Sequence, residues 1–174
     1  MATFDDVWTY DVARGTMSRL TTNPAQDRSP LWSRDGQRIL FTSGRNNYPE
    51  LFSKAADGTG TEERLFARAK DGVDLRANGW SADGRRLLFT EVPVSVNCAI
   101  GHAAVDKLSE QTMLVQNDFC NDYSAVSPDG RWIAYDSAVS GRTEVYVKRY
   151  PELGNRQQIS TGGGRMSLWS ANGR

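Results

Sequence analysis

The stretch Trp80-Ser81-Ala82-Asp83-Gly84 decides the fold of this chain, because close versions of it recur at regular intervals. The other versions are Trp32-Ser33-Arg34-Asp35-Gly36, Val126-Ser127-Pro128-Asp129-Gly130 and Trp169-Ser170-Ala171-Asn172-Gly173. In chain order their final glycines lie 48, 46 and 43 residues apart. A period of about 40 to 50 residues is typical of stacked or radial repeats. We therefore expect the chain to be a tandem repeat of one small structural unit.

Each version of the phrase predicts a hairpin turn followed by short strands. An Asp-Gly or Asn-Gly pair suits such a turn, because Gly accepts a positive φ and Asp or Asn tolerates it better than most residues. Three of the turns lead into runs that are apolar on both faces, as expected of strands covered on both sides. The second strands are expected at 38–42, 86–90 and 132–135, the third at 50–53, 103–105 and 144–147, and the fourth at 63–66, 112–115 and 157–160.

Four antiparallel strands per repeat, joined by short connections, describe the blade of an all-β propeller. We expect one domain over 1–174, with blades at about 28–67, 74–116 and 121–161. Residues 7–22 are interpreted as the third and fourth strands of a further, split blade, and 165–174 as its first strand, at 166–169. The total of about 3.75 blades favours an open arc over a closed ring.

The repeated phrase resembles the TolB-type, WD40-like propeller repeat, which has a Trp-Ser-Pro-Asp-Gly-Lys-like motif. The third copy, Ser127-Pro128-Asp129-Gly130, also has the proline of that motif, and the other copies have Arg34, Ala82 or Ala171 instead. The resemblance covers essentially the whole chain. It implies a propeller fold of a kind found in TolB, in prolyl oligopeptidases and in sensor domains of bacterial membrane kinases, and rings with more blades than this chain supplies.

Composition and motifs argue against several classes of function. Lys plus Arg equals Asp plus Glu at 21 each, so no basic surface for nucleic acid is expected. No apolar run approaches the roughly 18 residues that cross a bilayer, so we expect no membrane insertion, and the first ten residues do not resemble a signal peptide. No P-loop, nucleophile elbow or zinc-protease motif occurs, and His102 is the only histidine. We expect no catalysis, no cofactor and no metal, and we interpret the repeated Asp35, Asp83 and Asp129 as turn residues.

The sequence favours a non-catalytic scaffold that binds a protein, a peptide or a small ligand through its loops. One alternative is a regulatory or sensor propeller that is part of a larger bacterial kinase or peptidase. Another is a propeller-based sugar lyase or hydrolase, which would require Asp27, Asp74 and Asp122 to converge.

The candidate binding residues lie at the predicted channel mouth and in the loops. Four residues before each repeated phrase begins stand Arg28, Arg76, Asp122 and Arg165. Arginines gathered there would suit carboxylate or phosphate groups of an anionic ligand or acidic peptide, whereas the alternative is salt bridging to Asp27, Asp74 and Asp122. The loops at 44–48 and 92–97 are the other candidates, and Arg45 and Tyr48 belong to the first of them.

Two further expectations concern Cys98, Cys120 and the ends of the arc. A hairpin centred near Ser109 would place the two cysteines opposite each other, at a distance that permits a disulfide. Such a bond would imply an oxidising compartment such as a periplasm, and the alternative is a pair of reduced thiols. Apolar blade faces at the ends of an open arc would favour a homodimer, against a closed monomer or an aggregating fragment.

Overall fold

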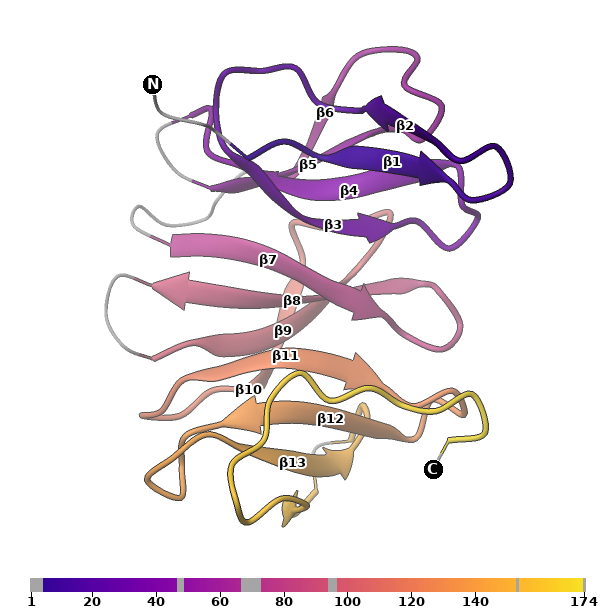
Figure 1. The fold of residues 1–174 in the computed structure, drawn as a ribbon. Helices are drawn as coiled ribbons and strands as arrows, with labels where there is room; N and C mark the ends of the chain where they lie inside the picture. The colour runs from indigo at the N-terminus through magenta and orange to yellow at the C-terminus, as the bar shows by residue number, and fades with distance from the viewer. Residues whose placement is uncertain (1–4, 47–48, 67–72, 94–96, 153, 174) are drawn as a thin grey trace. The chain divides into compact units, whose positions relative to one another are not determined.

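The computed structural model describes residues 5–46, 49–66, 73–93, 97–152 and 154–173. Within these ranges all the regular secondary structure is β-strand (Figure 1). The fold class expected from the sequence is therefore confirmed. None of these residues forms a helix long and apolar enough to cross a membrane. The chain divides into two compact units, residues 1–77 and 78–174, and the division falls inside strand β7.

The first unit contains a two-stranded and a four-stranded antiparallel sheet. The former pairs β1 with β2, and the latter has the order β3-β4-β5-β6. Val7 and Leu20, which flank the two-stranded sheet, meet side chains of β4 and β5 in one buried cluster. Five consecutive residues of β4 are buried, on both faces of the strand, as its apolar run predicted. The strands are β1 (Trp8–Asp11), β2 (Thr16–Arg19), β3 (Asp27–Trp32), β4 (Arg38–Ser43), β5 (Glu50–Ala55) and β6 (Glu63–Phe66).

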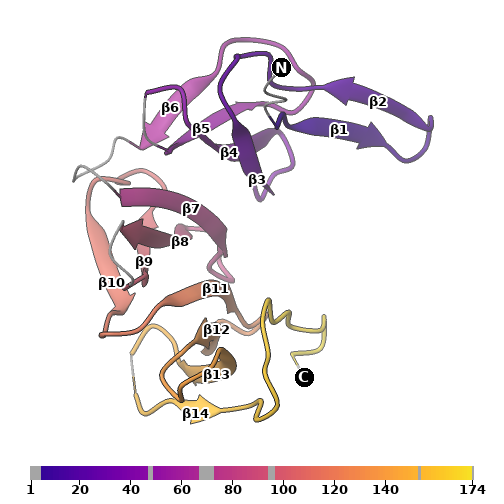
Figure 2. The same cartoon turned by 60° about the vertical axis from the view of Figure 1, so that its left-hand side comes forward.

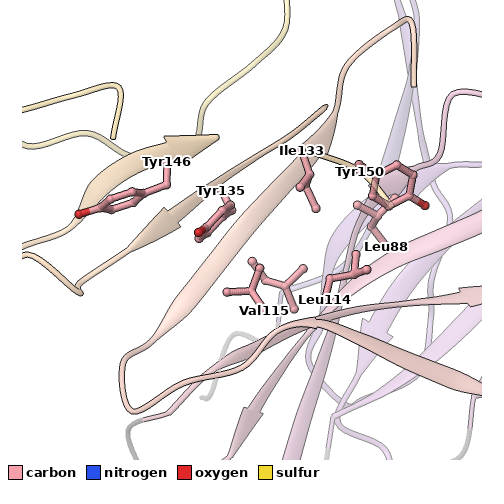
Figure 3. Packing of buried hydrophobic residues seen from close by; sticks show 8 residues of the cluster. Leu88, Leu114, Val115, Ile133, Tyr135, Tyr146 and Tyr150 are labelled. Carbon is pink, nitrogen blue, oxygen red and sulfur yellow. The ribbon is translucent and has the colours of Figure 1, made fainter. Parts of the chain in front are cut away.

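Two further four-stranded antiparallel sheets follow along the chain, with the strand orders β7-β8-β9-β10 and β11-β12-β13-β14 (Figure 2). In the second unit, β8, β9 and β10 share one hydrophobic core with β12 and β13, and it includes Leu88, Leu114, Ile133 and Tyr135 (Figure 3). The strands are β7 (Val73–Trp80), β8 (Arg86–Pro93), β9 (Ala99–Ala104), β10 (Gln111–Val115), β11 (Asn121–Val126), β12 (Trp132–Ser137), β13 (Glu144–Arg149) and β14 (Gln157–Gln158).

The repeated phrase closes the hairpin between the first and second strands of each four-stranded sheet. In the first copy the Ser33 hydroxyl donates to Asp35 Oδ1 at 2.6 Å and accepts from the Arg38 amide at 2.9 Å. Gly36 completes the turn with φ of 69°. The serine and aspartate of the next two copies repeat the hydroxyl bond, Ser81 to Asp83 and Ser127 to Asp129.

Three expected strands differ in the structure. The fourth strand of the last sheet, expected at 157–160, is only Gln157–Gln158. The third strand of the middle sheet begins at Ala99, not near Ala103, because Gly101 lies inside the strand opposite Phe89 and interrupts the apolar pattern. The segment 166–169 is not a strand, because the described residues offer it no neighbouring strand to complete a ladder. Instead the Trp169 indole nitrogen donates to the Ala125 carbonyl at 2.9 Å.

Candidate functional site

A backbone feature repeats near the starts of the first strands of the four-stranded sheets, here called the inner strands, and again in the segment before the fourth repeated phrase. In β3 and β11 the register shifts by one residue, which is a β-bulge. Ser29, Tyr123 and Met166, three residues before their respective repeated phrases begin, have φ of 54°, 50° and 55°. Non-glycine residues adopt this conformation rarely, and bulges often redirect side chains beside functional sites. The predicted site residues Arg28, Asp122 and Arg165 directly precede these three positions.

In the first unit the structure brings Arg28 and Arg76 together around one carboxylate. Arg28 donates to Asp74 Oδ2 at 3.2 Å, and the Nε of Arg76 lies 3.4 Å from the same oxygen. The two arginine side chains are 41% and 30% exposed, whereas Asp74 is only 14% exposed. The pairing with Asp74 that the sequence left as an alternative is present, and both guanidinium groups still reach solvent.

In the second unit Asp122 and Arg165 lie close to a third ionisable group, Asp136. Asp122 is the cross-strand partner of Asp136, which is 2% exposed and accepts from the Met166 amide at 2.9 Å. Burial raises the pKa of Asp136, and the Asp122 charge raises it further, whereas the Met166 amide and Arg165 act in the opposite direction. Arg165 itself donates to the Thr143 hydroxyl at 3.3 Å. No sequence pattern marked Asp136 as part of this group.

Arg45 is bound within the first unit. It donates to the Ser43 hydroxyl at 2.8 Å, pairs with Glu62 and with buried Asp27, and lies 4.1 Å from the centre of the Phe52 ring. Its side chain is only 15% exposed, so its main role is structural, in ion pairs within the first unit. The other loop candidate, Tyr48, lies outside the described residues, as do residues 94–96 of the second candidate loop.

Cys98 and Cys120 form a disulfide with their Cα atoms 4.2 Å apart, although the expected register is wrong. The hairpin of β9 and β10 pairs Gln111 with Ala103, so it is centred nearer Lys107 than Ser109, and a bulge follows at Met113. Cys120 lies beyond β10, directly before β11. The bond therefore joins the residue before β9 to the residue before β11, across a separation of 22 residues.

The single histidine occupies a buried structural position. His102 is 7% exposed, and its Nδ1 lies 2.9 Å from the Tyr150 hydroxyl. Burial lowers its pKa, and the positive charge of Arg86 lowers it further. Within the part of the chain that the structure describes, no three His, Cys, Asp or Glu side chains are grouped so as to hold a metal ion.

Comparison with known proteins matches residues 3–171 to the family model described as the TolB beta propeller domain. The Tol-Pal system protein TolB of Wolinella succinogenes is 31% identical over 88 residues, which cover 51% of this chain and 20% of that protein. The Tricorn protease homolog 1 of Streptomyces coelicolor is 30% identical over 86 residues, which cover 49% of this chain and 8% of that protein. Both matches thus span a small part of a longer relative.

A solved structure, the putative TolB of Agrobacterium tumefaciens, superposes with a TM-score of 0.76 at 20% identity. The match covers 91% of this chain and 56% of that structure. At this identity the likeness concerns the fold, and it agrees with four-stranded antiparallel blades.

Proposed function

Because this chain belongs to the TolB β-propeller domain family, we propose that it is a non-catalytic binding module whose partner presents carboxylate or phosphate groups to the starts of the inner strands. The partner that fits best is an acidic peptide segment, since arginines at these strand starts would contact successive negative groups. The competing proposal is that the chain is part of a longer enzyme, because one of the relatives is a Tricorn protease homolog.

One observation carries the proposal: Asp74 holds both Arg28 and Arg76 through a single oxygen while their guanidinium groups stay partly exposed. A guanidinium has five N–H donors in a rigid fork, and the bond to Asp74 engages only one nitrogen of Arg28, so the geometry of Arg28 suits a second, external anion. The carboxylate also orients the two side chains, which lowers the entropic cost of binding.

The test measures binding of a fluorescently labelled hexaglutamate peptide by anisotropy at low ionic strength. Arg28→Gln and Arg76→Gln should each weaken binding by about tenfold, since a hydrogen bond to a charged group contributes about 1.5 to 3 kcal/mol. Added salt should weaken the wild-type complex, because partly exposed charges are screened.

Arg149→Gln is the matched control, because Arg149 is an exposed arginine that lies over the Trp132 ring, away from the inner-strand starts. It should bind the peptide within about twofold of wild type. No measurable peptide binding by the wild type, or wild-type affinity in both Arg28→Gln and Arg76→Gln, would overturn the proposal.

We also propose that the chain works in an oxidising compartment, such as a periplasm or the cell exterior, where the bond between Cys98 and Cys120 persists. Closing a loop of this length contributes about 3 kcal/mol of stability in the chain-entropy model. Mass spectrometry of native material after alkylation without reductant should show two unmodified cysteines. Alkylation of both would argue for a reducing compartment.

A further inference from the structure

A pocket of about 420 Å³ lies in the second unit between the end of β10 and the sheet of β12 and β13. Tyr135 is one of its lining residues. It belongs to the same buried cluster as Leu114 and Val115 (Figure 3). This volume falls within the range of about 300 to 1,000 Å³ that is usual for small-molecule sites. The pocket's other lining residues include Gln116, Lys148, Asn155 and Arg156.

Among the described residues that line the pocket, two side chains are cationic and none is acidic. Lys148 is half-buried in β13, and Arg156 stands just before β14, with its guanidinium carbon 5.7 Å from the centre of the Tyr146 ring. Burial lowers the pKa of Lys148, and the charge of Arg156 lowers it further. Two neighbouring cations that repel each other in a partly enclosed pocket are stabilised when an anion binds between them.

A lysine at the equivalent position of the first unit, Lys54, indicates the structural role of Lys148. Lys54 and Lys148 occupy the same register, opposite Ile39 and Ile133. Lys54 donates to the Leu20 carbonyl at 2.9 Å, whereas Lys148 reaches the Leu114 carbonyl at 3.3 Å. The repeated contact ties the third strand of a sheet to the end of a preceding strand.

The contact of Lys148 is longer than a typical hydrogen bond and uses one of its three N–H groups. The aromatic pair beside it differs from that of the first unit as well. Phe41 and Phe52 occupy the positions that Tyr135 and Tyr146 occupy in the second unit, so the second unit has two phenol hydroxyls that the first unit lacks. The charge of Arg156 acts on Tyr135 also, lowering its pKa against the dominant effect of burial. The pocket therefore combines the cations of Lys148 and Arg156 with the Tyr135 hydroxyl, and the structural contact of the lysine with a carbonyl requires neither Arg156 nor that hydroxyl.

We propose that this pocket binds a small hydroxylated organic anion, with Lys148 and Arg156 holding its carboxylate or phosphate group and the Gln116 and Asn155 amides meeting its hydroxyls. An ammonium supplies a compact charge and a guanidinium a planar fork, which together suit an oxyanion with two or three oxygens. Its lining includes none of the arginines of the proposed peptide site, so either proposal can fail without the other.

Calorimetric titration of the full chain with glucuronate, glucose 6-phosphate and neutral glucose tests the proposal. Binding of either anion without binding of glucose is the expected result, and which anion binds distinguishes a carboxylate site from a phosphate site. Lys148→Met and Arg156→Gln should each weaken that binding by about tenfold, the effect of losing one charge-assisted contact.

Lys54→Met is the matched control, because it removes the same carbonyl contact outside the pocket, and it should leave anion binding unchanged. If Lys148→Met proves unstable in thermal unfolding, Arg156→Gln decides, since Arg156 is exposed. Arg28→Gln should also bind the anion normally, which separates this site from the peptide site. Failure of both anions to bind, equal binding of glucose, or unchanged binding in Arg156→Gln would overturn the proposal.

Discussion

At the scale of single residues, the serine and the acidic or amide residue of the repeated phrase act as a pair. The hydroxyl bond recurs in the fourth copy between Ser170 and Asn172 at 2.6 Å. Gly173 there has φ of 75°, close to the value at Gly36. The turn is thus determined locally, by side chains two residues apart and a glycine that permits positive φ.

The aspartates of the three other copies should give the protein an acid-sensitive stability. The serine hydroxyl, followed by the backbone amide two residues beyond the aspartate, lowers the pKa of Asp35, Asp83 and Asp129 below the ordinary value of 3.8. A carboxyl whose folded-state pKa is lowered stabilises the fold above its unfolded pKa, and this stabilisation is lost as the pH falls through the folded-state pKa.

Replacing all three aspartates by asparagine should keep the turns, as Asn172 shows, and remove that loss. We expect the acid-unfolding midpoint, followed by circular dichroism, to move to lower pH. The exposed Asp118→Asn, outside these turns, serves as the control and should leave the midpoint in place. A triple variant with the wild-type acid midpoint would contradict this account.

At the scale of strands and sheets, the middle four-stranded sheet differs from the other two in the cross-strand pair between its second and third strands. Phe41 faces Phe52, and Tyr135 faces Tyr146, as stacked cross-strand pairs. In the middle sheet Phe89 faces Gly101. A Cβ built at Gly101 would lie 2.6 Å from the tip of the Phe89 ring, so the ring fills the space of the missing side chain.

Gly101→Ala should therefore destabilise the chain by about 1 to 3 kcal/mol, as overpacking of a tight core does. Urea unfolding would measure the effect. Gly79→Ala is a matched control, because Gly79 also lies in a strand and a Cβ there meets no atom within 4 Å. Replacing the ring with the smaller leucine side chain, Phe89→Leu, in the Gly101→Ala background should recover part of the lost stability. An equal loss of stability in Gly101→Ala and Gly79→Ala would reject the packing explanation.

At the scale of the whole molecule, the two-stranded sheet of the first unit exposes an apolar face. Trp8, Tyr10 and Met17 are 52%, 59% and 65% exposed, and strand alternation together with the pairing of Tyr10 and Met17 puts them on one side. Exposed apolar patches on soluble proteins commonly mark interfaces, and a two-fold dimer would use the same patch in both copies.

We expect the protein to dimerise through this face. Light scattering coupled to size exclusion should give a mass near twice the 19.3 kDa of one chain at high concentration. Tyr10→Glu should shift the mass toward one chain, because a charge would be buried in the interface. A monodisperse mass of one chain at every accessible concentration would rule the dimer out.

The sequence by itself determined the repeat, the turns and nearly every strand, because the Asp-Gly turns and apolar runs act over a few residues. It also identified the family, and the pairing of Arg28 with Asp74 was among its alternatives. It did not mark the bulges at Ser29 and Tyr123, since neither is a glycine whose presence would announce a positive φ.

Only the tertiary structure decided which candidates meet. It assigned Arg45 to Asp27 and Glu62, placed Asp136 beside Asp122, and brought Lys148 and Arg156 to one pocket with the end of β10. Lys148 and the Leu114 carbonyl, for instance, are 34 residues apart. Contacts of that range depend on strand register, which one bulge shifts by a residue, so no local pattern in the chain could predict them.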